Sequence, residues 1–170
     1  IGHSNGGRII IKLMNNKNLK FNVEKIILIG SAGIVHKKKL SQKLKVRCFK
    51  TGKFILNLKP VRLVFPKALD KFKNSFGSAD YRNASPMMRT ILVNTVNEDL
   101  TEYLKQIDAP TLLIWGSMDT AVPLEDAKYA ESIMTDAGLI VYEGCTHYAY
   151  LERINEVINV LNVFLKEGKK

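Results

Sequence analysis

Residues 1–16 read IGHSNGGRIIIKLMNN, and the fold can be worked out from this stretch. A leading apolar residue is followed by small residues, after which apolar residues recur at helical spacing from Ile9 to Met14. This pattern predicts the end of a strand, a sharp turn and then a helix. Gly2, Ser4 and Gly6 also match the motif GxSxG, which places a serine at the tip of such a turn. Ser4 is therefore a candidate nucleophile.

The spacing of GxSxG has a physical reason. A serine at the tip of a tight strand-to-helix turn takes strained backbone angles, and we expect Gly2 and Gly6 to let the strand and the helix approach closely. The N-terminus of the following helix supplies free N–H groups and positive potential. The backbone amide of Asn5 could then donate to an oxyanion that develops beside Ser4.

Three short apolar runs after the motif predict strands that are buried on both faces. They are VEKIILIG at residues 23–30, TLLIWG at 111–116 and AGLIVYEG at 137–144. Helical patterns cover residues 122–134 and run from about Tyr150 to Lys166. The inner side of the last helix is expected to carry Leu151, Ile154, Val157, Ile158, Leu161 and Leu165. Strands that alternate with helices indicate an α/β fold with a parallel sheet.

Residues 36–97 interrupt this alternation. From His36 to Thr90 there are fifteen Lys or Arg residues against two acidic residues, which more than accounts for the net charge of +10. The basic residues are interleaved with Leu, Phe and Val, a pattern typical of amphipathic helices whose lysine stems lie along an apolar surface. This favours a solvated helical face, with an anionic substrate or an acidic partner as the alternative, over a nucleic-acid-binding surface.

Asp119 and His147 are the candidate partners of Ser4. Asp119 lies in WGSMDTAVP directly after the second apolar run, and His147 lies in EGCTHYAYLE directly after the third. Parallel strands place such residues at the edge where open α/β sheets carry their sites. A serine nucleophile needs a base, and the base needs an orienting carboxylate. The chain order Ser, Asp, His therefore predicts a triad of Ser4, Asp119 and His147.

Each of these residues also has a structural interpretation. Ser4 could belong to an ordinary turn, Asp119 could cap the following helix, and His147 could be a satisfied loop histidine. His3 and His36 are not expected to act as the base, because the side chain of His3 should point away from the nucleophile and His36 begins the interrupted region.

Three motifs in register resemble the α/β-hydrolase superfamily, and specifically its capped esterase-like and C–C hydrolase-like branch. GHSNGG resembles the nucleophile elbow, APTLLIWGSMDTAVP resembles the acid turn, and GCTHYAYLERINEV is similar to the histidine loop, with Thr146 in place of the usual glycine. The resemblance implies a core at residues 1–35 and 98–170 and a helical cap at residues 36–97. It also implies further strands before the elbow, so that a chain beginning at Ile1 is expected to be N-terminally truncated.

The resemblance implies a serine hydrolase that acts on a small carboxylic ester or a related acyl substrate, with no metal and no organic cofactor. A C–C bond hydrolase or a thioesterase would use the same residues. The catalytic residues would be Ser4, Asp119 and His147. The residues of the oxyanion hole and the substrate site would be His3, Asn5, Met87 and Met88.

A hypothesis of another class is a catalytically silent fragment that associates with itself. Without preceding strands, the strand at residues 23–30 would expose an apolar edge, and such an edge favours pairing with another chain. We therefore expect a homo-oligomer for the isolated chain.

Cellular location follows from composition. Cys48 and Cys145 are far apart and show no metal-ligand spacing, which favours a reducing compartment. No apolar run approaches the roughly 20 residues of a membrane helix, and the first residues do not read as a signal peptide. We expect a cytoplasmic protein that binds neither nucleic acid nor a membrane.

Overall fold

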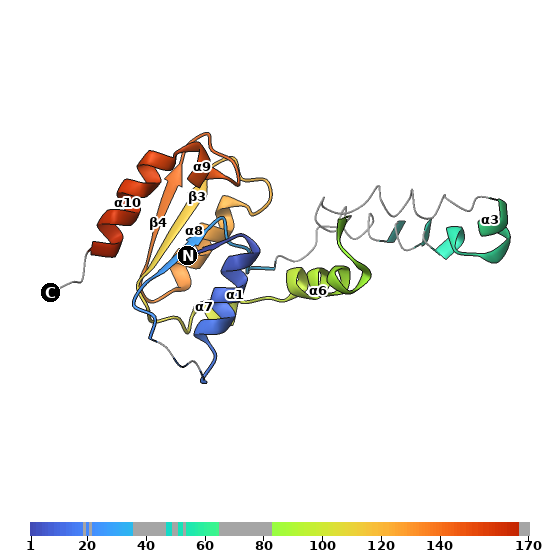
Figure 1. Ribbon diagram of the computed structural model, residues 1–170, viewed down its shortest axis with the longest axis horizontal. Helices are drawn as coiled ribbons and strands as arrows, with labels where there is room; N and C mark the ends of the chain where they lie inside the picture. The colour runs from blue at the N-terminus through green and yellow to red at the C-terminus, as the bar shows by residue number, and fades with distance from the viewer. Residues whose placement is uncertain are drawn as a thin grey trace. The chain divides into compact units, whose positions relative to one another are not determined.

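The computed structural model describes residues 1–18, 20, 22–35, 47–48, 51–52, 54–64 and 83–166. The chain divides into two compact units. The first unit is Ile1–Val35 with Glu98–Lys170, and the second unit is His36–Asn97. In Figure 1 the first unit is the part that contains the labelled strands, and its helices lie on both faces of the sheet.

The sheet of the first unit has four parallel strands in the order β1-β2-β3-β4. They are β1 (Gly2–His3), β2 (Ile26–Ile29), β3 (Thr111–Gly116) and β4 (Ala137–Tyr142). In the register of this sheet, Ile29 pairs with His3 on one side and with Ile114 on the other, so the carboxyl ends of the strands share one edge. The predicted α/β fold with a parallel sheet is confirmed.

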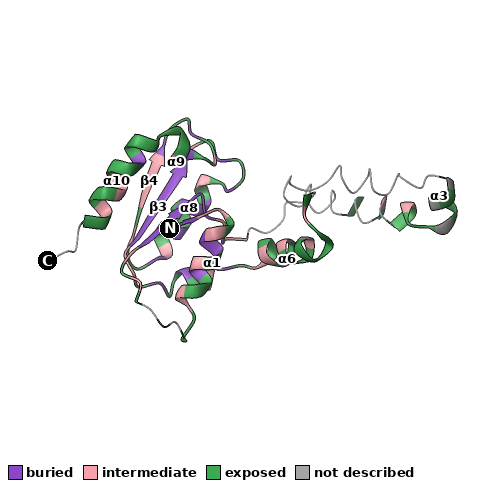
Figure 2. Ribbon diagram, in the orientation of Figure 1, coloured by how far each residue is buried: buried purple, intermediate pink, exposed green. Residues whose placement is uncertain are grey.

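Side chains of the inner strands alternate between two hydrophobic cores. Ile26 and Leu28 of β2 belong to one core and Ile27 and Ile29 to the other, because successive side chains of a strand point to opposite faces. The first core lies under α1 (Asn5–Met14), α7 (Thr101–Leu104) and α8 (Leu124–Ile133), and the second under α9 (Ala149–Glu152) and α10 (Ile154–Lys166). In Figure 2, β3 is buried along its whole length and β4 is partly exposed.

The strand predicted at residues 23–30 is shorter in the structure. Its pairing with β3 begins at Ile26 opposite Thr111, because the residue before Thr111 is Pro110, which has no N–H for the ladder. On its other side β2 is not a free edge, since Gly2 and His3 pair with Leu28 and Ile29. The free edge expected for this strand is therefore wrong over Leu28 and Ile29, because β1 pairs with them.

The last helix also differs from its prediction. It is divided at Arg153 into α9 and α10. The residues that pack on the second core are Val157, Val160, Leu161 and Phe164. Of the six residues predicted for the inner side, Leu151, Ile154, Ile158 and Leu165 are left at least 48% exposed. The predicted inner side was wrong for these four, because apolar residues surround much of this helix and their spacing alone does not select one face.

The second unit includes α3 (Lys59–Val64) and α6 (Pro86–Asn97). No residue of α6 is buried. The basic helices expected between His36 and Thr90 lie largely outside the described residues. Over the described part of the chain, the helices are too short or too polar to cross a bilayer.

Candidate active site

Ser4 occupies the turn between β1 and α1. Its φ is 52°, and within the described ranges it is the sole residue other than glycine with a positive φ. A residue held in such a sparsely populated conformation costs about 1–3 kcal/mol, so its surroundings must stabilise it. The N–H of Ser4 donates to the carbonyl of Ile29 at 3.0 Å, which fixes the turn against the end of β2. The Ser4 side chain makes no capping hydrogen bond to α1.

Glycines allow β1, α1 and the end of β2 to approach closely. A Cβ on Gly2 would lie 2.7 Å from Cδ1 of Ile10, and a Cβ on Gly7 would lie 2.1 Å from Oγ of Ser31. A Cβ on Gly6 would meet no atom of the described residues within 4 Å. The expectation for Gly2 and Gly6 is therefore right for Gly2 and wrong for Gly6. Gly7 has that role instead, because it lies on the buried side of α1.

Asp119 and His147 are joined by a hydrogen bond at the carboxyl edge of the sheet. Nδ1 of His147 lies 2.7 Å from Oδ2 of Asp119, and the two side chains are 14% and 0% exposed. Oδ1 of Asp119 accepts the backbone N–H groups of Ala121 at 2.8 Å and Val122 at 2.9 Å. Because the carboxylate only accepts, Nδ1 of His147 carries the hydrogen, and Nε2 is left as the acceptor nitrogen of that ring.

The end of β2 connects Ser4 to the Asp119–His147 pair. The residue after Ile29 is Gly30, which has a φ of 48°. A Cβ on Gly30 would lie 3.0 Å from Nδ1 of His147 and 3.2 Å from Oδ2 of Asp119. The Asp119–His147 pair therefore lies over Gly30, which directly follows the residue that binds the N–H of Ser4. No hydrogen bond joins the Ser4 hydroxyl to His147 in the described part of the chain. Gly30 was not among the predicted site residues, although a glycine that closes a buried strand is a signal in the sequence.

The loop that carries His147 is held on two sides. A Cβ on Gly116, the last residue of β3, would lie 2.3 Å from the carbonyl oxygens of Cys145 and Thr146. The backbone N–H of Thr146 donates to Oε2 of Glu152 at 2.9 Å, and the Thr146 hydroxyl donates to Oε1 of the same carboxylate. These bonds, the one from the hydroxyl first, lower the pKa of Glu152. Thr146, which stands in place of the usual glycine, thus ties the histidine loop to α9.

This pKa shift predicts an acid-sensitive contribution to stability. Because the pKa of Glu152 is lower in the folded chain than its ordinary value of 4.5, its stabilisation is present above pH 4.5 and is lost as the pH falls through the lowered pKa. Glu152→Gln keeps an acceptor without the charge. We expect its unfolding temperature to fall less steeply below pH 4.5 than that of the native chain, as measured by circular dichroism. Thr146→Val, which removes one donor, should give part of the same change, and parallel pH profiles for all three proteins would contradict the assignment.

The residues predicted for the oxyanion hole and the substrate site lie on three different elements. Asn5 begins α1, and no carbonyl of that helix can reach its N–H. His3 donates from Nε2 to the backbone carbonyl of His147 at 3.0 Å. Met87 and Met88 lie on α6 in the second unit, where their side chains are exposed. Their role in substrate binding stays a prediction.

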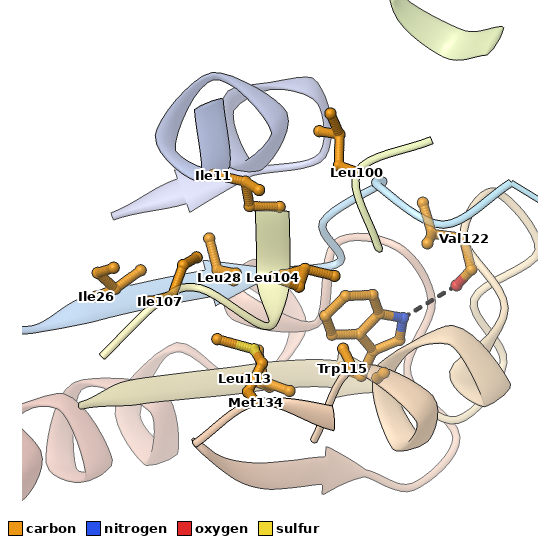
Figure 3. Close-up of a cluster of buried hydrophobic side chains, with 12 residues drawn as sticks. Ile11, Ile26, Leu28, Leu100, Leu104, Ile107, Leu113, Trp115, Val122 and Met134 are labelled. Atoms are coloured by element: carbon orange, nitrogen blue, oxygen red, sulfur yellow. Dashed lines mark hydrogen bonds between the residues drawn. The ribbon is translucent and has the colours of Figure 1, made fainter. Parts of the chain in front are cut away.

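The acid turn is anchored by the hydrophobic core beneath it. The indole N–H of Trp115 donates to the carbonyl of Val122 at 3.0 Å, as the dashed line in Figure 3 shows. Trp115 is 2% exposed and packs among the residues of the first core. Val122 is therefore held at its carbonyl by Trp115 and at its N–H by Asp119.

Known sequences match these motifs. A family model described as serine aminopeptidase, S33, matches residues 1–154. The chain is 32% identical over 102 residues to a proline iminopeptidase of Heyndrickxia coagulans, a match that covers 59% of this chain and 35% of that protein. It is 29% identical over 80 residues to a pimeloyl-[acyl-carrier protein] methyl ester esterase of Aliivibrio fischeri (strain MJ11), which covers 47% of this chain and 31% of that protein. The chain thus spans about a third of the length of these curated relatives.

Solved structures share the fold at lower identity. The esterase RhEst1 from Rhodococcus sp. ECU1013 aligns with a TM-score of 0.61 at 17% identity, over 98% of this chain and 64% of its own. A bromoperoxidase from Bacillus anthracis aligns with a TM-score of 0.60 at 22% identity, over 98% of this chain and 66% of its own. The relatives are hydrolases of the α/β fold, and the family model covers most of the sequence. The chain therefore belongs to the α/β-hydrolase superfamily, within the family described as serine aminopeptidase, S33.

Proposed function

We propose that the chain is a serine hydrolase that acts on a small carboxylic ester or a related acyl substrate through Ser4, His147 and Asp119. The observation that carries the proposal is the hydrogen bond between Nδ1 of His147 and the buried Oδ2 of Asp119. An imidazole held in this tautomer offers Nε2 as a base, which is what a serine nucleophile requires.

The proposed reaction assigns one role to each side chain. The Ser4 hydroxyl attacks the substrate carbonyl while Nε2 of His147 takes its proton. Asp119 accepts the hydrogen bond from Nδ1 and stabilises the imidazolium that forms. The oxygen of the tetrahedral intermediate becomes negative, and the free N–H of Asn5 at the start of α1 supplies one donor to it. His147 then gives the proton to the leaving group as the bond between that group and the acyl carbon breaks, which leaves an acyl ester on Ser4. A water molecule, with His147 again as the base, cleaves this ester and restores Ser4.

Stoichiometric labelling tests this proposal. The purified chain is incubated with a fluorophosphonate, and the modified residue is located by mass spectrometry. We expect a single adduct on Ser4, because a serine activated by a base attacks the phosphorus and an isolated serine does not. Ser4→Ala should give no adduct. A folded native chain that remains unlabelled would contradict the proposal.

The substrate class is tested separately, since an ester, an amide and a C–C bond can all be cleaved by the same three residues. The two relatives named above are an iminopeptidase and a methyl ester esterase. We propose the ester class, and p-nitrophenyl acetate should therefore be hydrolysed faster than proline p-nitroanilide. The reverse order would place the chain with the iminopeptidase. In either case we propose that Met87 and Met88 contact the substrate from the cap. We also propose that the enzyme is cytoplasmic.

The alternative is the silent fragment that associates with itself, and one surface feature favours it. An apolar hollow of about 170 Å³ is lined by Ile1, Ile10, Leu13, Met14, Val23, Lys25 and Ile26. It adjoins β1, the edge strand of the sheet. A second copy of the chain could cover this hollow and pair with that edge. Light scattering that gives an oligomer, together with absent labelling, would favour the alternative.

A further inference from the structure

The side chain of His3 connects β1, the strand that leads to Ser4, with the loop that carries His147. It is the last residue of β1 and directly precedes Ser4. Its Nε2–H donates to the backbone carbonyl of His147 at 3.0 Å, and the centroids of the two rings lie 4.7 Å apart. The His3 side chain thus contacts the backbone and the ring of His147 at once.

Two further rings surround His3. The centroid of the Tyr150 ring lies 5.0 Å from that of His3, and the Tyr148 ring lies at 5.6 Å. Tyr148 and Tyr150 follow His147 in the same loop and in α9. These distances are in the range of aromatic packing. The His3 ring is therefore packed against the histidine loop, and the Nε2–H has a defined acceptor.

We propose that His3 is a positioning residue that sets the separation between Ser4 and His147. This inference rests on the proposed function, in which His147 is the base for Ser4. The backbone of His3 continues directly into Ser4, and its side chain holds the carbonyl of His147. One residue consequently couples the position of the nucleophile to the position of the base.

The other contacts of His147 do not replace this one. The hydrogen bond with Asp119 orients the imidazole ring at Nδ1. The bonds between Thr146 and Glu152 tie the preceding residue to α9. Neither contact connects the histidine loop to β1. Because a displacement of about 1 Å between reacting groups can cost about a hundredfold in rate, a direct link between these segments affects the reaction step.

Two amide variants that differ in length test the inference. His3→Gln keeps an N–H donor at a similar reach, and His3→Asn carries the same amide on a side chain that is one methylene shorter. The rate of Ser4 labelling is measured against fluorophosphonate concentration, which separates the maximal rate from the half-saturating concentration. For His3→Asn we expect a maximal rate about tenfold lower with an unchanged half-saturating concentration, and for His3→Gln a rate within about threefold of native.

The outcomes separate this inference from the proposed function. If the native chain is unlabelled, the proposed function fails and the inference falls with it. If the native chain is labelled and His3→Asn reacts at the native rate, or if Gln and Asn are equally slow, the inference alone is overturned. A purely structural role would lower the unfolding temperature and leave the rate per folded molecule unchanged. Tyr129→Phe on the exposed side of α8 is the control, and His3→Phe replaces His3→Asn if the latter does not fold.

Discussion

Asp119→Asn is expected to slow the reaction of Ser4 by about 10⁴-fold, the effect of this exchange in a Ser-His-Asp triad. The amide oxygen can still accept the N–H groups of Ala121 and Val122, as Oδ1 of Asp119 does at 2.8 and 2.9 Å. The amide nitrogen then faces Nδ1 of His147 and can only donate. His147 must accept through Nδ1 and carry its hydrogen on Nε2, which removes the proposed base.

The measurement is the rate of fluorophosphonate labelling, together with the unfolding temperature. Because the acid turn keeps its two backbone hydrogen bonds, we expect the unfolding temperature of Asp119→Asn to stay near the native value. Asp108→Asn, an exposed aspartate before β3, is the matched control and should react at the native rate. Near-native labelling of Asp119→Asn would leave Asp119 with only its structural role in the turn.

Gly30→Ala is the second change with a large expected effect. Its Cβ would lie 3.0 Å from Nδ1 of His147 and 3.2 Å from Oδ2 of Asp119, which is closer than ordinary van der Waals contact. The imidazole and the carboxylate would have to move apart, and the labelling rate should fall on the order of 100-fold. Because alanine at a φ of 48° is strained in the folded state, the substitution should also lower the free energy of unfolding by about 1–3 kcal/mol.

The control for this variant is Gly138→Ala. Gly138 lies in β4, and a Cβ there would meet no atom of the described residues within 4 Å. Labelling rates per folded molecule and denaturant unfolding are compared for the two alanine variants. Gly30→Ala should lose both rate and stability, and Gly138→Ala should keep its rate. Equal rates for the two variants would show that the space at Gly30 is not needed.

The elements that carry the site were predictable because their signals are local. TLLIWG begins after a proline and is largely apolar, and it forms β3 at the predicted residues. The helix with early acidic residues begins at Leu124 after Pro123, as Pro at a helix start favours. Asp119 and His147 could be placed at one edge since both follow parallel strands. The order of the strands and of these two residues along the chain was enough to predict that they pair.

Other features depend on contacts between distant segments, which spacing does not encode. The GxSxG motif points to Gly6, and only the packing of α1 on Ser31 shows that its neighbour Gly7 is the constrained glycine. The role of Gly30 depends on His147, more than a hundred positions away in the sequence. For His3, the sequence predicted only that its side chain points away from Ser4. Its hydrogen bond to the carbonyl of His147 could not be predicted, because the two residues are far apart in the sequence and meet only in the folded chain.

The core beneath the acid turn gives the chain a built-in optical reporter. Trp115 is the single tryptophan of the sequence, so all indole emission comes from this position. Its N–H is bound to Val122, which in turn donates to Asp119. Loss of that linkage would admit water to the indole and shift its emission to longer wavelength. Fluorescence therefore monitors the integrity of the turn that holds His147 without any attached label.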